Sequence, residues 1–165
     1  MNHIMSQSMT DTSAAVGADA QQEFVTATIG GQMFGLPILR VQDVFVVDRL
    51  TYVPLAPVEI AGVLNLRGRI VTIIDMRVRL GVDRAGTPAR QMAIGVESRG
   101  ESYGLLVDAI GEVMKLDQDI CEANPVNLDP RLAAVSTGIY RLDGSLLIAL
   151  DLDKVLEIGG VATAA

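Results

Sequence analysis

Residues 62–80 read GVLNLRGRIVTIIDMRVRL, and residues 138–156 read GIYRLDGSLLIALDLDKVL. The two stretches align without a gap. A second pair of stretches precedes them, because FGLPILRVQDVFVVD (34–48) aligns with YGLLVDAIGEVMKLD (103–117) in the same way. The matched positions include Gly62 with Gly138, Leu66 with Leu142, Gly68 with Gly144, Asp75 with Asp151, and Gly35 with Gly104. Two matched blocks in the same order predict one small β module that is built twice.

The two copies differ at one turn. The second copy has Asp143-Gly144, which is typical of a tight hairpin, whereas the first copy has Arg67-Gly68, preceded by Asn65. An arginine is not favoured by the conformation of such a turn, so Arg67 is the first candidate for a functional residue. The alternative is a solvated turn cation, although the rigid fork of arginine suits an interface contact better.

Asp43 and Glu112 are also equivalent in the repeat, and each precedes a strand-like run. Their equivalence suggests a scaffold role for both, but Asp43 belongs to the copy that contains Arg67, and the two side chains could pair. Apolar residues near these positions, such as Val44 and Val113, are expected mainly in the core. Any of them that faced a groove between the two halves would give it an apolar floor suited to an amphipathic helix.

The composition indicates an all-β protein without nucleic-acid or membrane chemistry. Half of the 165 residues are apolar, aromatic residues are scarce and Trp is absent, so Ile, Val and Leu must fill the core, which suits strands. Thirteen basic and 20 acidic residues give a net charge of −7, which disfavours binding to a phosphate backbone. The lone Cys121 fits a reducing compartment, and no apolar run approaches the length needed to span a bilayer. A cytoplasmic location is expected.

Strand patterns recur at short spacing, separated by glycine turns. Strands are expected at 24–29, 32–38, 44–47, 62–66, 69–75, 91–97, 102–108, 110–116, 138–142 and 145–151, with a helical turn at 76–80. Residues 1–22 are expected to be a disordered tail, 159–165 a second tail, 81–90 a linker and 117–137 an irregular connection. About five strands in each half predict two small barrels or a sandwich, with a groove between the halves.

The residues that catalysis would need are scarce. His3 is the only histidine and lies in the expected N-terminal tail, so a nucleophile–histidine pair on a rigid scaffold is unavailable. Asp151 and Asp153 could hold Mg²⁺ at the end of a strand, with Asp75 or Asp108 nearby. The structural alternative is that Asp151 ends a strand and Asp153 caps the following helix. We therefore predict a protein that is not an enzyme and that has no metal and no cofactor.

Four blocks, GVLNLRGRIVTIIDMR, FGLPILRVQDV, YGLLVDAIGEV and GIYRLDGSLLIALDLDKVL, resemble the CheW-type chemotaxis coupling proteins, over residues 23–158. The resemblance implies two SH3-like five-stranded barrels, the first mainly 34–80 and the second mainly 91–157, and leaves strand exchange between them open. It also implies a non-enzymatic adaptor that is monomeric alone. Such adaptors link the cytoplasmic tip of chemoreceptors to the regulatory domain of a CheA-type histidine kinase, in arrays at the membrane.

The same resemblance implies two groups of contact residues. The receptor-facing groove would contain Val41, Asp43, Asn65, Arg67, Gly68, Met92, Ile110 and Val113. Met92 would lie on the facing strand of the second barrel. The kinase contact of the first barrel would contain Ile38 and Gly62.

Two residues depart from the family pattern. Thr72 stands where the family usually has proline. Threonine has the backbone N–H that proline lacks, and we expect it on an edge strand, where either residue is tolerated. Asp43 is one methylene shorter than the usual glutamate, so any pairing with Arg67 must be closer or mediated by water. Two other functions stay open: a stand-alone inhibitor that mimics the regulatory domain of the kinase, and a metal-dependent hydrolase that uses Asp151 and Asp153.

Overall fold

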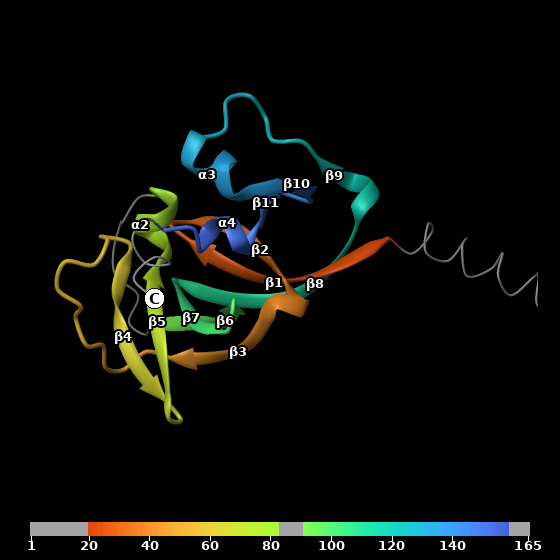
Figure 1. Ribbon diagram of the computed structural model, residues 1–165. Helices are drawn as coiled ribbons and strands as arrows, with labels where there is room; N and C mark the ends of the chain where they lie inside the picture. The colour runs from red at the N-terminus through yellow and green to blue at the C-terminus, as the bar shows by residue number, and fades with distance from the viewer. Residues whose placement is uncertain (1–19, 83–90, 159–165) are drawn as a thin grey trace, which may run out of the picture.

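The structure, a computed structural model, describes residues 20–82 and 91–158 (Figure 1). The first half contains β1 (Gln21–Ile29), β2 (Gln32–Pro37), the 3-10 turn η1 (Ile38–Arg40), β3 (Val41–Val46), β4 (Ile60–Leu66), β5 (Arg69–Asp75) and α2 (Met76–Leu80). The second half contains β6 (Met92–Ser98), β7 (Glu101–Val107), β8 (Ala109–Asp117), the 3-10 turn η2 (Gln118–Ile120), β9 (Cys121–Glu122), α3 (Pro130–Val135), β10 (Ser136–Leu142), β11 (Ser145–Leu150) and α4 (Leu152–Val155). The all-β prediction is confirmed.

The strands form two sheets that exchange hairpins between the sequence halves. One sheet has the order β8-β1-β2-β11-β10-β9, and the other has the order β3-β6-β7-β5-β4. The β1–β2 hairpin of the first half therefore completes the sheet of the second half, and the β6–β7 hairpin does the reverse. Neither sheet consists of 34–80 or of 91–157 alone.

The internal repeat is visible in the backbone. Gly62 in β4 and Gly138 in β10 each sit at a register shift of their hairpin, with φ of 157° and 155°. The carboxylates of Asp75 and Asp151 each accept hydrogen bonds from the backbone amides of the second and third residues of the helix that follows, at 3.0–3.4 Å. The structural role predicted for this pair is confirmed. The prediction that Asp153 caps the last helix is wrong, since Asp151 is the cap.

Three hydrophobic clusters form the core. Successive strand residues point to opposite faces of a sheet. One face of the β8-β1-β2-β11-β10-β9 sheet packs around Phe24 and Leu147, and one face of the β3-β6-β7-β5-β4 sheet packs around Phe45 and Ile73. The other faces contribute to one larger cluster that contains residues of both sheets, including Leu105. This shared layer holds the two sheets together and fixes the position of the surface between them.

Two ion pairs connect the two halves of the chain. In the first pair the helix supplies the cation, and in the second pair it supplies the anion. The Arg77 guanidinium of α2 binds both carboxylate oxygens of Asp108 at 2.7 and 2.8 Å, with side chains only 14% and 18% exposed. Burial favours a higher pKa for Asp108, but hydrogen bonds from Arg77 and from the Gly30 amide, with the guanidinium charge, hold that pKa below its ordinary value. In the second copy, Asp153 of α4 pairs with Arg40 of η1 at 3.0 Å, in a more exposed setting.

Some boundaries differ from those that the sequence predicts. β1 takes in residues 21–22 of the expected tail, and the expected irregular connection 117–137 contains η2, β9 and α3. Thr72 is not on an edge, because β5 is hydrogen-bonded to both β4 and β7. Most of the expected linker, the rest of the N-terminal tail and the C-terminal tail after residue 158 lie outside the described residues. Within the described ranges, no helix has the length and apolar character required to cross a membrane.

Candidate protein-binding site

The β4–β5 hairpin carries the turn at which the two copies differ, and its tip projects from the lower edge of the molecule in Figure 1. Leu66 and Arg69 are the last paired residues, so Arg67 and Gly68 form a two-residue turn. Their φ angles are 52° and 85°, the pattern of a type I′ turn. The Asn65 side chain accepts a hydrogen bond from the Gly68 amide at 2.8 Å and stabilises the turn.

Arg67 is held in a conformation that a non-glycine residue rarely adopts. The left-handed region costs an ordinary L-residue roughly 1–2 kcal/mol. In the second copy, Asp143 avoids that region and only Gly144 has a positive φ. Arg67 shares the left-handed conformation with two other described non-glycine residues, Leu55 and Arg99. A side chain kept at such a position, and 77% exposed, contributes little to packing, which favours a role in binding.

The Asp43 carboxylate of β3 lies 3.8 Å from the Arg67 guanidinium. This separation permits charge attraction but exceeds the range of a direct hydrogen bond. The two side chains lie at the mouth of a small cavity of about 80 Å³, which Phe45 and Val71 of the adjacent barrel core also line. An anionic or carbonyl group of a partner could therefore engage Arg67 without first breaking a tight internal pair.

Gly95 makes room for this arrangement and is not among the residues predicted from the sequence. A side chain at Gly95 would collide with the Asp43 carboxylate, which lies across the backbone of β6 at that point. Extension of the repeat alignment by a few residues places Thr26 at the equivalent position of the second sheet. The Thr26 hydroxyl there donates to the backbone oxygen of Glu112 at 2.7 Å. Comparison of residues 23–29 with 92–98 would have revealed this difference.

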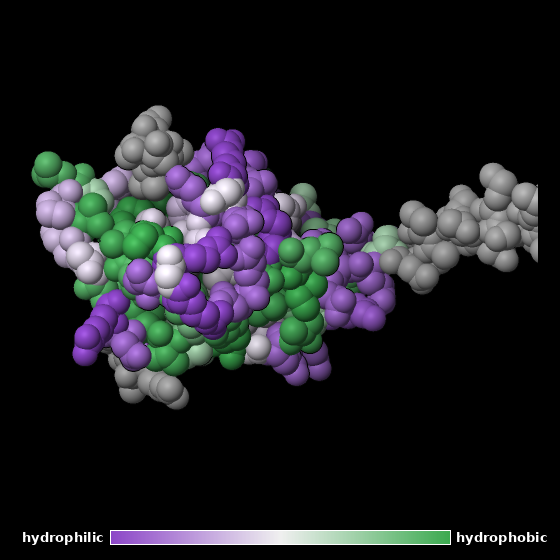
Figure 2. Space-filling view, turned by 60° about the horizontal axis from the view of Figure 1, so that its bottom comes forward, coloured by the Kyte–Doolittle hydropathy of each residue, from purple (hydrophilic) through white to green (hydrophobic). Residues whose placement is uncertain are grey.

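β3 and β8 are equivalent edge strands, one in each sheet. Val41 and Ile110 match in the repeat, and both are partly buried against the shared core. Val44 and Val113 also match, and both are exposed, at 42% and 48%. Figure 2, which brings the lower side of Figure 1 forward, shows apolar surface interleaved with hydrophilic residues on that side. Both edge strands therefore have the same pattern, with one partly buried and one exposed aliphatic residue. The apolar face of a helix can pack against the exposed residue.

Met92 does not lie where the sequence analysis placed it. It belongs to β6, which pairs with β3 so that Met92 is opposite Val46. Since the β6–β7 hairpin has joined the sheet of the first half, Met92 lies in the same sheet as Val41 and does not face it from the second barrel. It is partly buried against the shared core.

The two residues assigned to a kinase contact lie at different places. Ile38 is half-buried in η1, between β2 of one sheet and β3 of the other. Gly62 lies in β4, at the opposite edge of the β3-β6-β7-β5-β4 sheet, and is buried. An added Cβ at Gly62 would come within 2.7 Å of the Thr51 backbone oxygen. Gly62 is therefore required for the close approach of the loop before β4, and its assignment to a kinase contact stays a prediction.

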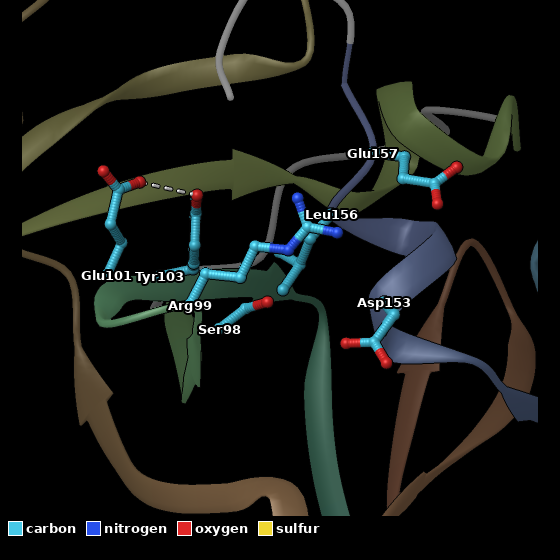
Figure 3. A pocket seen from close by; sticks show the side chains of 7 residues that line it. All are labelled: Ser98, Arg99, Glu101, Tyr103, Asp153, Leu156 and Glu157. Atoms are coloured by element: carbon cyan, nitrogen blue, oxygen red, sulfur yellow. Dashed lines mark hydrogen bonds between the residues drawn. The ribbon is translucent and has the colours of Figure 1, made fainter. Parts of the chain in front are cut away.

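A second hollow, of about 250 Å³, lies between the β6–β7 turn and α4 (Figure 3). Figure 3 shows Glu101 directed toward the Tyr103 hydroxyl, from which it accepts a hydrogen bond of 2.9 Å. Asp153, from α4, is the partner of Arg40. Since the carboxylates of Glu101 and Asp153 already have protein partners, this hollow is a weaker candidate than the surface around Arg67.

The proposed metal pair is used by the scaffold. Asp151 caps α4 and Asp153 forms the ion pair with Arg40, so each carboxylate has a structural role. Among the residues that the structure describes, no three His, Cys, Asp or Glu side chains come together as a metal site. Cys121 is half-buried and packs against the cluster around Phe24, as expected for a small apolar side chain.

Comparison with known proteins gives one consistent family. The model of the CheW-like domain matches residues 23–159. Chemotaxis protein CheW of Klebsiella aerogenes is 30% identical over 145 residues, which cover 88% of this chain and 87% of that protein. Protein PilI of Pseudomonas aeruginosa is 26% identical over 140 residues, covering 81% and 79% of the two chains.

A solved structure shows the same architecture. The scaffolding protein TtCheW from Thermoanaerobacter tengcongensis superimposes with a TM-score of 0.76 at 31% identity, and the match covers 84% of this chain and 90% of that one. The prediction of two SH3-like barrels is confirmed.

Proposed function

Because this chain belongs to the CheW-like family, we propose that it is a non-enzymatic adaptor that couples the cytoplasmic tips of chemoreceptors to a CheA-type histidine kinase. It works in the cytoplasm and is recruited to receptor arrays at the membrane. The chemistry is binding alone, and the partners are the receptor tip and the regulatory domain of the kinase.

The asymmetry between the two copies carries this proposal. Both copies build the same barrel with the same bulges and helix caps, but of the two equivalent turns, 67–68 and 143–144, only the first has a cation in the left-handed conformation. Only there does a glycine in the neighbouring strand, Gly95, let a carboxylate lie across the sheet toward that turn. Features that stabilise the fold are repeated at equivalent positions. A feature that only one of two equivalent turns has, and that costs backbone energy, supports a role in recognition.

The receptor contact combines this charged corner with the aliphatic residues of the edge strands. An amphipathic helix from the receptor tip would place its apolar face against Val44 and Val113, with Val41 and Ile110 beneath them. Arg67 would donate to carboxylate or carbonyl groups of that helix, and a charge-assisted hydrogen bond of this kind contributes about 1–3 kcal/mol.

Each contact is expected to be weak when it forms alone. A small barrel offers a modest face, and we expect a dissociation constant of roughly micromolar, about −8 kcal/mol. A bound partner raises the effective concentration of the next, so the protein should be monomeric alone and firmly held only when receptor and kinase are both present.

The experiment is a titration of a receptor cytoplasmic fragment with the wild-type chain, with Arg67→Glu and with the matched control Asp143→Ala in the second copy. We expect the Arg67→Glu variant to keep its melting temperature and to bind the receptor about 5- to 150-fold more weakly, which corresponds to 1–3 kcal/mol. The control should bind like the wild type. Unchanged receptor binding by Arg67→Glu would contradict the assignment.

The same titration separates an adaptor from an inhibitor that mimics the kinase regulatory domain. An adaptor binds the receptor fragment as well as the kinase. A tight complex with kinase that forms without receptor and suppresses autophosphorylation would identify the chain as an inhibitor.

A further inference from the structure

A hollow of about 570 Å³ lies beside η1, and its apolar lining consists of Pro37, Ile38 and Leu39. Leu39 has 95% of its surface exposed, so a large apolar side chain borders the hollow almost uncovered in the described part of the chain. Its polar lining consists of Lys115 of β8 and residues 21–23 of β1. We call these residues the η1 surface.

The open edge of β1 forms part of this surface. Pairing between β1 and β2 begins at Phe24 opposite Pro37, so residues 21–23 pair only with β8 on their other side. Their second edge faces η1 and has unpaired backbone groups in the described part of the chain. An extended segment can bind there by adding to the strand edge while its apolar side chains contact Ile38 and Leu39.

The chain enters the structure at this same place. The Ala20 backbone oxygen accepts a hydrogen bond from the Gln118 amide at 2.8 Å, and β1 begins at the next residue. Nineteen residues precede Ala20. At roughly 3.3 Å per residue they can span up to about 60 Å, far more than is needed to fold back over a hollow lined by residues 21–23.

We propose that residues 1–19 of this chain dock on the η1 surface. A segment attached beside its binding site has an effective concentration on the order of millimolar, so a weak contact is enough to keep the site occupied. The segment supplies apolar side chains at positions 1, 4, 5 and 9, three of them methionines. Methionine is unbranched and adapts to irregular apolar surfaces such as the one around Leu39.

Docking would regulate the adaptor, and this consequence rests on the proposed function. Ile38 is assigned to the kinase contact, so a segment that covers Ile38 competes with the kinase. If it covers the surface most of the time, the apparent affinity for kinase falls by about 3- to 10-fold, because only the uncovered fraction can bind. The segment then acts as an internal competitor that the kinase must displace.

Methyl NMR of the full-length chain tests the docking without any partner. The methyl signals of Met1, Met5 and Met9 report on the segment, and those of Met33, Met76, Met92 and Met114 serve as internal references. We expect the three segment signals to move to the positions of an unbound peptide in Leu39→Asp. They should stay unchanged in the matched control Leu55→Asp, because Leu55 is also fully exposed but lies in the loop before β4.

Three outcomes would overturn the docking: segment signals at unbound positions in the wild type, equal responses to both leucine variants, or shifts that depend on protein concentration. The last would show that the segment binds a second copy instead. For the regulatory consequence, Ile4→Ser, Met5→Ser and Met9→Ser together should raise kinase affinity by about 3- to 10-fold, and Ser6→Ala with Ser8→Ala should not. Docking without any change in kinase affinity would contradict the kinase contact at Ile38 and leave the docking intact.

Discussion

Replacement of Arg67 by asparagine should stabilise the protein while it weakens receptor binding. Arg67 has a φ of 52° in a two-residue turn that is followed by Gly68. Asn-Gly is a favoured sequence for a type I′ turn, because asparagine tolerates the left-handed region that arginine resists. Arg67→Asn therefore relieves backbone strain and removes the cation in one step.

The magnitude follows from two opposing terms. Relief of the left-handed strain is worth about 1 kcal/mol, since asparagine retains part of the cost. Loss of the ion pair with Asp43 costs roughly 0.3 kcal/mol, because the two charges are 3.8 Å apart and the Arg67 side chain is largely exposed. The net gain is about 0.5–1 kcal/mol, which raises the melting temperature by roughly 2 °C in a domain of this size.

Calorimetry and a receptor-binding titration on the same preparations check both effects. Asp143→Asn is the matched control, because Asp143 does not have a positive φ and its replacement should leave the melting temperature within about 1 °C. Receptor affinity should fall about 5- to 150-fold in Arg67→Asn alone. A variant that melts several degrees lower, or binds receptor as the wild type does, would refute the view of Arg67 as a strained recognition residue.

Three further predictions concern the edge strands, the junction and the helix cap. Val113→Asp should shift the melting temperature by only a few degrees, since Val113 is 48% exposed, yet abolish docking of an apolar helix; unfolding instead would place Val113 in the core. Because the folded pKa of Asp108 lies below its ordinary value of 3.8, its contribution is present above about pH 4 and is lost as the pH falls through the folded pKa. Denaturant unfolding between about pH 2 and pH 7 should show this loss, and Arg77→Gln should reduce it and destabilise the protein by roughly 2–3 kcal/mol at neutral pH. Asp151→Ala should lower the free energy of unfolding by about 1 kcal/mol and Asp153→Ala by less, and the reverse order would contradict the assignment of the cap.

The sequence predicts the strands of this fold well because the repeat supplies two independent copies of each signal. Alternating apolar residues, glycine turns and matched aspartates define the hairpins and the helix starts. The repeat does not predict which strands each hairpin pairs with. A repeat shows that 24–38 and 91–108 are equivalent, but either hairpin fits either set of strands equally well by pattern. The exchange is therefore decided by long-range packing, and Met92 was assigned to the wrong sheet for this reason.

The candidate site was only partly predictable. Arg67 stands out because the equivalent residue of the second copy is Asp143. Asp43 stands out because it has an acidic equivalent, Glu112, and lies in the copy that contains Arg67. Gly95 carries no chemistry of its own, and its importance lies in the space it leaves for the Asp43 carboxylate. Gly62 was predicted at a contact, and the structure shows in addition that it lets the chain pass close to Thr51. Close backbone approaches of this kind depend on the three-dimensional structure and leave no local pattern.

The most direct test of the adaptor function is co-sedimentation of kinase with receptor arrays, in which the amount of kinase in the pellet is measured with and without this chain. We predict that the kinase sediments efficiently only when the chain is present, and that Arg67→Glu removes this effect while Asp143→Ala preserves it. Equal amounts of kinase in the pellet with and without the chain, or a chain that stays in the supernatant with the kinase, would contradict the adaptor function.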